Sequence, residues 1–246
     1  MKEDSAVMVA IPDVHGRTFW REAVERHKDL PVVFLGDYLD PYYDEDISRE
    51  DALNEFKSIL EYKKENPDRV TLLFGNHDIH YLCVDFEATR KDRANEEEIR
   101  NLFQSNLSLF HMASCFKTGE REFLFTHAGV LSGWYLQYFP KETLASAELI
   151  CNSLNGKMED EQTWEIFLRT ALTDVSMYRY GGDLYGSCVW ADVREYPKDR
   201  ETIKGVYQVF GHTQLREGPF ISSYFADLDC RKAFVITESG NIMPVS

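Results

Sequence analysis

Five short apolar runs recur along the chain, and each leads into a polar cluster marked by glycine or proline. The runs are AVMVAI, VVFLGD, RVTLLF, REFLF and VYQVF, and the clusters that follow them are PDVHG, YLDPY, GNHD, THAG and GHT. Each run has the length of a strand, is rich in β-branched or aromatic residues and is bounded by turn residues. The pattern therefore predicts five buried strands, each followed by a loop.

Apolar residues at helical spacing alternate with the first of these runs. A capping-box match at Ser48–Asp51 and an acidic helix start at 95–98 each precede such residues, and residues 18–30 and 163–172 also predict helices. Two later apolar stretches, 220–225 and 233–237, predict strands. The order of these elements predicts an α/β sandwich of mixed β-sheets flanked by helices.

Nothing in the sequence divides the chain into separate parts. It contains no internal repeat, no low-complexity tract and no linker rich in proline, glycine or serine. We therefore expect a single domain over residues 1–246. Residues 131–205 carry the weakest pattern, which predicts a helical and loop insertion, a variable cap, ahead of the last polar cluster.

The composition excludes several classes of protein. The 246 residues are 43% hydrophobic and 13% aromatic, which excludes wholesale disorder, and the net charge of −15 argues against a protein that grips long nucleic acid or a membrane. We expect neither a signal peptide nor a membrane span, because the apolar runs are too short. The five cysteines are scattered and odd in number, which is typical of reduced thiols. These features together predict a cytoplasmic protein.

Candidate chemistry is concentrated in the five polar clusters, which hold four of the seven histidines. Taken singly, each polar residue there is better explained as a turn or core residue than as a functional one. All five clusters nevertheless follow predicted strands, and the binding sites of α/β sheets lie at the carboxyl ends of strands. The shared position predicts one functional site, whose candidates are Asp13, His15, Asp37, Asp40, Asn76, His77, Asp78, His127 and His212.

The residue types in these clusters predict a metal centre. Two ionised aspartates brought together among imidazoles repel each other unless a cation lies between them. Carboxylate and amide oxygens with imidazole nitrogens, and no thiolate, suit Mn²⁺, Fe²⁺/³⁺ or Zn²⁺ better than Ca²⁺ or Cu⁺. Six ligands exceed the need of one tetrahedral ion, and a carboxylate can bridge two ions. We therefore expect two divalent metal ions, with Mn²⁺ as the favoured identity.

The ordered motifs D-x-H, G-D-x-x-D, G-N-H-D, H-A-G and G-H-T resemble those of the calcineurin-like metallophosphoesterase superfamily. They span Asp13 to Thr213, which is most of the chain. The final G-H-T has Gln214 in place of a second histidine, and this is most similar to the branch of phosphoprotein phosphatases and diadenosine tetraphosphatases. The resemblance implies the metallophosphoesterase fold and a hydrolase of phosphate esters.

The resemblance also implies roles for the motif residues. Asp13, His15 and Asp37 would bind the first metal, and Asp37 would bridge to a second. A hydroxide that bridges the metals would attack phosphorus in line, and His77, oriented by Asp40, would protonate the leaving oxygen. Asp78 is expected to fix its loop instead of taking part in chemistry. The remaining ligands of the second metal would be Asn76, His127 and His212.

Two departures from the family pattern leave phosphate recognition open. An Arg-Gly pair normally follows G-D-x-x-D, but Pro41 and Tyr42 stand in its place, and the first motif has Pro12 where glycine is usual. Phosphate recognition favours the planar, bidentate guanidinium, so another arginine is needed. The candidates, each of which is equally well explained as a solvated surface residue, are Arg17, Arg179 and Arg194.

We expect a phosphomonoesterase that resembles serine/threonine protein phosphatases. The alternatives are a nucleotide pyrophosphohydrolase or phosphodiesterase similar to diadenosine tetraphosphatases, and a catalytically silent metal-binding scaffold. Retention of both His77 and Asp40 argues against the scaffold. The expected partners are a phosphorylated small molecule, a nucleotide or a phosphoprotein, and neither long nucleic acid nor a membrane.

Overall fold

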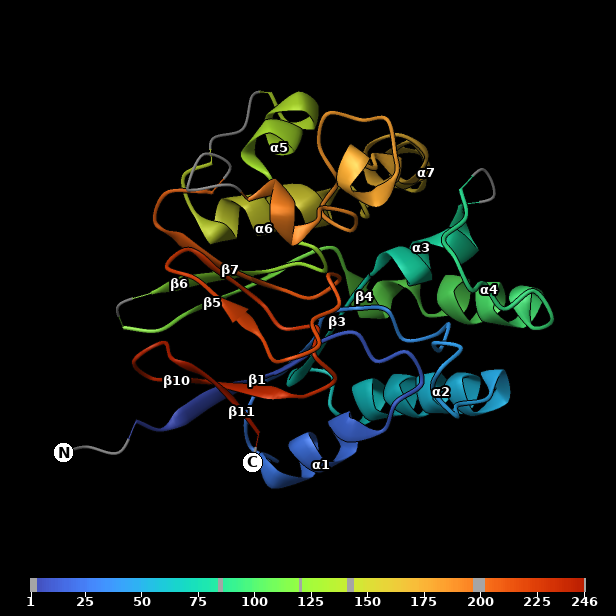
Figure 1. The fold of residues 1–246 in the computed structure, drawn as a ribbon, viewed down its shortest axis with the longest axis horizontal. Helices are drawn as coiled ribbons and strands as arrows, with labels where there is room; N and C mark the ends of the chain where they lie inside the picture. The colour runs from blue at the N-terminus through green and yellow to red at the C-terminus, as the bar shows by residue number, and fades with distance from the viewer. Residues whose placement is uncertain (1–3, 84–85, 120, 141–143, 197–201, 246) are drawn as a thin grey trace. The chain divides into compact units, whose positions relative to one another are not determined.

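The computed structural model describes residues 4–83, 86–119, 121–140, 144–196 and 202–245 (Figure 1). The chain divides into two compact units: unit 1 comprises Met1–Phe110 and Arg231–Ser246, and unit 2 comprises His111–Cys230. Each unit contains one mixed β-sheet with helices beside it. The predicted fold class, mixed sheets flanked by helices, is confirmed. The single domain over residues 1–246 stays a prediction.

The sheet of unit 1 has the strand order β11-β10-β1-β2-β3-β4. Strands β1, β2 and β3 are parallel neighbours, while β10 runs antiparallel to both β1 and β11. The carboxyl ends of the three parallel strands therefore meet at one edge, and the loops that carry Asp13, Asp37 and Asn76 emerge there. The strands are β1 (Ala6–Ile11), β2 (Val32–Phe34), β3 (Val70–Leu73), β4 (Phe110–His111), β10 (Phe234–Thr237) and β11 (Ile242–Pro244).

In the described residues of unit 1, four α-helices lie between strands of this sheet along the chain, and α2 starts where the sequence predicts. Ser48 accepts a hydrogen bond from the backbone N–H of Asp51 at 3.0 Å and donates to its carboxylate at 2.6 Å, which caps the helix. The helix predicted over 18–30 ends earlier, at Arg26. The helices are α1 (Phe19–Arg26), α2 (Arg49–Glu65), α3 (Asn76–Leu82), α4 (Glu96–Ser105) and the 3₁₀ turn η1 (Leu107–Leu109).

A cluster of buried aromatic rings supports the loops after β2 and β3. Phe56 of α2 lies 4.7 Å from Phe103 of α4, centroid to centroid, and 5.4 Å from Tyr38. Phe74 stacks on Phe110 at 4.6 Å. Tyr38 follows Asp37 in the chain and Phe74 precedes the GNHD motif, so the packing of these rings fixes both loops.

The sheet of unit 2 has the strand order β5-β6-β7-β9-β8. Strands β6 and β7 are parallel, with Phe125 opposite Val209, so the loops that carry His127 and His212 leave the sheet at the same edge. The strands are β5 (Ser114–Lys117), β6 (Glu122–Phe125), β7 (Val206–Phe210), β8 (Phe220–Ile221) and β9 (Phe225–Asp227).

The prediction of one strand over 220–225 is wrong. The backbone turns at Ser222, whose hydroxyl accepts hydrogen bonds from the N–H groups of Tyr224 and Phe225 at 3.1 and 3.0 Å. A serine that bonds to the backbone two or three residues ahead favours a turn over an extended strand. The segment therefore forms the antiparallel pair β8–β9.

The described residues between 131 and 196 form helices and loops, with a single bridge between Ser176 and Asp183, as the predicted insertion requires. Helix α6 packs on β5 and β6. The helix predicted over 163–172 starts at Glu161, after the capping carboxylate of Asp160, and ends at Arg169. The elements are α5 (Ser132–Tyr138), α6 (Ala147–Gly156), α7 (Glu161–Arg169) and the 3₁₀ turns η2 (Ala171–Thr173), η3 (Met177–Arg179) and η4 (Val193–Glu195).

Among the helices of the described residues, none combines the length and the apolar character needed to cross a membrane.

The aromatic cluster predicts a large stability effect at its centre. Phe56→Ala removes a fully buried ring and should lower the free energy of unfolding by about 3–5 kcal/mol. Tyr43→Ala, which truncates an aromatic side chain that is 84% exposed, should change it by less than about 0.5 kcal/mol. Urea denaturation followed by circular dichroism measures both variants, and equal effects would contradict the prediction.

Candidate active site

Several motif residues have a backbone conformation that is unusual for residues with a β-carbon. The φ angles are +45° for His15, +54° for Asp37, +61° for Asp40 and +70° for His212. Such a left-handed conformation costs roughly 1–2 kcal/mol per residue. It persists where the surrounding structure imposes it, and it is concentrated at functional sites. The surrounding structure therefore imposes the backbone conformation of the motif loops, against the conformational preference of the residues themselves.

Close backbone packing explains the glycines of the second and third motifs. Gly36 has a φ of +100°, and a β-carbon there would lie 2.5 Å from the backbone nitrogen of Gly75. A β-carbon on Gly75 would lie 2.2 Å from Oδ1 of Asp37. The ends of β2 and β3 thus approach each other so closely that neither position has room for a side chain.

The carboxylate of Asp78 clamps these two loops together. Its Oδ2 accepts hydrogen bonds from the backbone N–H groups of Asp37 and Gly75 at 2.8 and 2.7 Å, and its Oδ1 accepts from Tyr38 at 3.1 Å. Asp78 is completely buried. These contacts support the expected role of Asp78 in fixing the loop.

Three predicted metal ligands of unit 1 lie together. One ligand atom from each of Asp13, His15 and Asp37 lies within 4.8 Å of the others, and all three residues are buried. Asp37 Oδ1 also accepts the backbone N–H of His77 at 2.9 Å, which aims the carboxylate. Asn76 is buried as well and begins α3, directly after β3 and Gly75.

The tautomer of His15 fits a metal ligand. Its Nδ1 lies 2.6 Å from the carbonyl oxygen of Leu39, and a carbonyl oxygen only accepts, so Nδ1 carries the hydrogen. Burial lowers the pKa of His15 from 6.5 to about 3, so the ring is neutral and Nε2 presents a lone pair. Nε2 lies 3.4 Å from Asp37 Oδ2, which also carries lone pairs. Two acceptors that face each other are stabilised by a cation that binds both, which is the arrangement of a metal site.

His77 and Asp40 form a buried dyad. His77 Nδ1 donates to Asp40 Oδ2 at 2.8 Å, so Nε2 points away from the carboxylate. Burial disfavours the charged form of Asp40, but contacts with His77 and His80 outweigh it, and the pKa of this carboxyl lies well below its usual range. Asp40 is therefore ionised and orients the imidazole without supplying a proton itself.

Three further groups contact the Asp40 carboxylate. Oδ1 accepts from the hydroxyl of Tyr81 at 2.6 Å and from the backbone N–H of Asp92 at 3.3 Å, and His80 Nε2 lies 2.9 Å from Oδ2. The Ala88 N–H donates to His80 Nδ1, which leaves the hydrogen of this ring on Nε2. Asp40, His77 and His80 are close enough to hold a metal ion. The nitrogens that face Asp40, His77 Nδ1 and His80 Nε2, carry hydrogen atoms, however, so they have no lone pair to offer a metal. The group is a hydrogen-bonded network.

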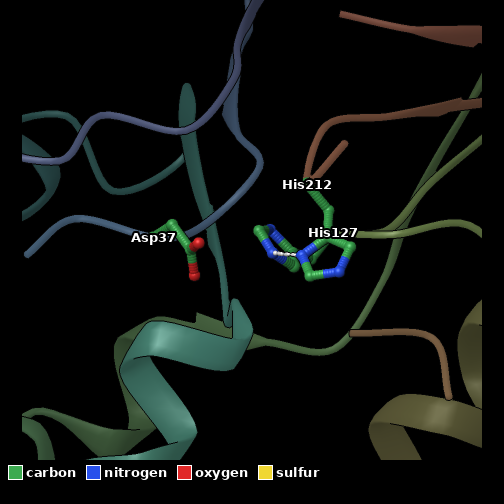
Figure 2. A group of neighbouring side chains, drawn as sticks. All are labelled: Asp37, His127 and His212. Atoms are coloured by element: carbon green, nitrogen blue, oxygen red, sulfur yellow. Dashed lines mark hydrogen bonds between the residues drawn. The ribbon is translucent and has the colours of Figure 1, made fainter. Parts of the chain in front are cut away.

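Unit 2 contributes the remaining two histidines. His127 Nε2 and His212 Nδ1 lie 3.2 Å apart and share a hydrogen bond (Figure 2). Both residues are buried, and Trp190 packs edge-on against the His212 ring at 5.5 Å. Both nitrogens can bind one cation once the shared hydrogen moves to the other nitrogen of its ring, because only a nitrogen without hydrogen is a metal ligand.

Comparison with known proteins agrees with this geometry. The family model for calcineurin-like phosphoesterases matches residues 8–215. The chain belongs to the calcineurin-like phosphoesterase family. Members of this family are metal-dependent hydrolases of phosphate esters, so the chain is a hydrolase that acts on phosphorylated substrates. No curated protein matches significantly.

Solved structures that share the fold include two phosphatases. One is a cold-active protein tyrosine phosphatase, with a TM-score of 0.56 and 14% identity over 98% of this chain and 79% of that one. The other is a protein serine/threonine phosphatase from Saccharomyces cerevisiae with similarity to human phosphatase PP5. It has a TM-score of 0.53 and 15% identity over 100% of this chain and 84% of that one. At this identity the likeness concerns the fold.

The guanidinium of Arg17, one of the three arginines expected at the phosphate of this phosphoesterase, is engaged by an acid. Its Nε and Nη2 donate to the Glu45 carboxylate at 2.7 and 2.9 Å, and its Nη1 donates to the carbonyl oxygen of Asp13 at 3.0 Å. Glu45 also pairs with Arg231 at 2.7 Å. Arg17 thus supports the loop of the first motif, and its role at the phosphate stays a prediction.

Arg179 and Arg194 share one carboxylate in unit 2. Arg179 Nε lies 2.9 Å from Asp192 Oδ2, and its Nη2 donates to the carbonyl oxygen of His212 at 3.2 Å. Arg194 donates to both oxygens of Asp192 at 2.7 and 3.0 Å. Arg179 therefore lies beside a metal-ligand candidate, whereas Arg194 is bonded to Asp192 in a fork. Their roles at the phosphate also stay predictions.

Sequence reasoning missed His80, Tyr81 and Arg90. Tyr81 and His80 contact Asp40, and Arg90 Nη2 lies 3.3 Å from His77 Nε2. The spacing of His77 and His80, three residues apart, carried a signal, because residues three apart share one face of a helix. Arg90 lies outside every motif and had no such signal.

The environment of His15 predicts its behaviour in the metal-free protein. With a pKa of about 3 in the folded state and 6.5 as its ordinary value, His15 should remain neutral with the hydrogen on Nδ1 throughout pH 5–7.5. Between about pH 6.5 and 3 the unfolded chain binds a proton that the folded chain does not. His15 therefore lowers folded-state stability as the pH falls through that range. Long-range ¹H–¹⁵N spectra of the imidazoles measure the tautomer and the protonation of His15. Protonation of the folded protein's His15 with a midpoint within pH 5–7.5 would contradict the prediction.

Proposed function

We propose that this protein is a phosphomonoesterase with two metal ions, similar in reaction to serine/threonine protein phosphatases. The observation that carries the proposal is the pairing of His15 Nε2 with Asp37 Oδ2 in unit 1, which also contains the His77–Asp40 dyad. A cation-binding pair and an oriented imidazole supply the two functions that hydrolysis of a phosphate ester needs.

The proposed ligands follow the family motifs. Asp13, His15 and Asp37 would hold one ion, and Asp37, Asn76, His127 and His212 would hold the other. When bound, divalent ions lower the pKa of water and neutralise the charge of the phosphoryl oxygens. The oxygen and nitrogen donors, without thiolate, suit Mn²⁺, and Fe and Zn²⁺ are the competing identities.

The residues of the dyad define the proton transfer. His77 Nδ1 is fixed by Asp40, so Nε2 is the atom that delivers a proton to the leaving oxygen of the ester. Asp40 stays ionised, so it stabilises the protonated form of the ring in place of competing for the proton. The second histidine, His80, holds the other side of the same carboxylate oxygen and keeps Asp40 in position.

The charge of the chain narrows the proposed substrates. A net charge of −15 disfavours long nucleic acid and anionic membranes, while bound divalent ions provide local positive charge within a Debye length of about 8 Å. We therefore propose a phosphorylated small molecule, a nucleotide or one exposed phosphate on a protein as the substrate.

All five cysteines are free, which supports a reducing compartment and a cytoplasmic location.

A panel of three substrates tests the reaction. With Mn²⁺, the protein should hydrolyse p-nitrophenyl phosphate and should not hydrolyse its bis ester or diadenosine tetraphosphate. Asp37→Asn removes the charge of a carboxylate that would bind the metal ions, so it should abolish turnover and reduce the metal content, measured by elemental analysis. Asp44→Asn, an exposed change in the same loop, should leave both unchanged.

The other outcomes of the panel are informative. Activity on the bis ester or the dinucleotide alone would replace the phosphomonoesterase with a phosphodiesterase or pyrophosphohydrolase. A metal content near two per chain without turnover of any substrate would indicate a silent scaffold.

The role of His77 is tested separately from metal binding. His77→Asn should lower kcat by about 10²–10⁴-fold, because a general acid is lost, while the metal content stays near two per chain. His27→Asn, at the end of α1, serves as the matched control and should leave kcat unchanged. A fall in metal content in the His77 variant would show instead that His77 is a ligand.

A further inference from the structure

Arg90 lies beside the imidazole nitrogen that the proposed reaction uses. It belongs to the loop between α3 and α4, and its Nη2 is 3.3 Å from His77 Nε2. Because Nδ1 of His77 contacts Asp40, Nε2 is the ring atom that faces the guanidinium. Arg90 therefore faces the position where the leaving oxygen of an ester would receive its proton.

Three contacts fix Arg90 in this place. Its Nε donates to the carbonyl oxygen of Asp40 at 3.1 Å, and its guanidinium lies over the ring of Tyr42 at 3.9 Å from the centroid. Its own carbonyl oxygen accepts from Nη1 of Arg49 at 2.8 Å. The φ angle of +63° is left-handed, so the loop holds the residue in a conformation that it would not adopt by itself. This arrangement is pre-organised.

The charge of Arg90 is not neutralised by an acid. Within the described part of the chain, no carboxylate lies within 4.0 Å of its guanidinium, whereas Arg17 is bound by Glu45 and Arg194 by Asp192. A guanidinium has five N–H donors. Arg90 uses one toward Asp40, one toward His77 and one toward Thr89, the last at 3.4 Å from Nη1, so donors remain for a ligand. A half-buried cation with free donors attracts a multiply charged anion.

We propose that Arg90 binds the phosphoryl oxygens of the substrate and replaces the arginine that is missing after GDYLD. The proposal rests on the proposed function, because it assigns a binding residue to that reaction. Tyr42 stands at the second position of the absent Arg-Gly pair, and its ring now supports an arginine from a different loop. A cation–π contact of this kind orients a guanidinium while leaving its edge available to an anion.

Substitutions at Arg90 test the proposal on two readouts. With Mn²⁺-loaded protein, Arg90→Ala should raise the KM for p-nitrophenyl phosphate and the inhibition constant of inorganic phosphate by at least about tenfold each. Arg90→Lys keeps the charge but loses the fork and should recover only part of the affinity. Calorimetric titration with inorganic phosphate measures the same loss without turnover.

Two matched variants control the experiment. Arg93→Ala removes an exposed arginine of the same loop, paired with Glu87, and should leave KM and phosphate affinity unchanged. Tyr42→Leu removes the ring under Arg90 and should weaken phosphate binding by a smaller factor, whereas Tyr42→Phe keeps the ring and should weaken it less than Tyr42→Leu. Elemental analysis and circular dichroism confirm that each variant retains its metals and its fold.

The outcomes separate this proposal from the proposed function. If wild-type protein with bound metal does not turn over the monoester, the proposed function fails. If wild-type turnover is normal and Arg90→Ala keeps the KM and the affinity for inorganic phosphate, the role of Arg90 is overturned alone. A fall in kcat with unchanged phosphate affinity would show that Arg90 acts only through His77, which also overturns the proposal.

Discussion

The site of unit 1 depends on one buried carboxylate that joins two strand ends. Asp78 accepts backbone hydrogen bonds from Asp37, Tyr38 and Gly75, and these three bonds connect the loop after β2 to the loop after β3. Without them, the left-handed turn at Asp37 and the close approach of Gly75 would lack their support. The backbone geometry of these two loops therefore sets the position of the Asp37 carboxylate, a proposed metal ligand.

A second carboxylate organises the chemistry next to this clamp. Asp40 receives hydrogen bonds or close contacts from two imidazoles, a phenol and a backbone N–H, so both oxygens of this buried anion have more than one polar group within 3.3 Å. Such a network is rigid, because movement of any member would leave the buried charge of Asp40 with one hydrogen-bond partner fewer, which costs free energy in apolar surroundings. Through the carbonyl oxygen of the same residue, the network also reaches Arg90.

The sequence allowed the frame of the molecule to be predicted. Strands such as β1 and β2 are continuous apolar runs with clear ends, and the helix start at Ser48 has its own chemical signal, so both depend on local information. The polar residues after each strand could be grouped because parallel strands end at one edge. The clustering of Asp13, His15 and Asp37 follows from that rule.

What could not be predicted depends on contacts distant in sequence. Arg90 reaches Asp40 across 50 residues, and nothing near either residue signals the pairing. Helix α3 was missed because its seven residues include three polar motif positions and lack an apolar stripe. The turn at Ser222 was missed because the apolar residues on both sides resemble one continuous strand.

The left-handed angles at His15, Asp37 and His212 have a consequence for the evolution of the protein. Each conformation stores strain of roughly 1–2 kcal/mol that a glycine would release. On the proposed function, the need for a ligating side chain is what opposes glycine at these positions. A lineage released from that proposed reaction would relax its backbone by replacing these residues with glycine.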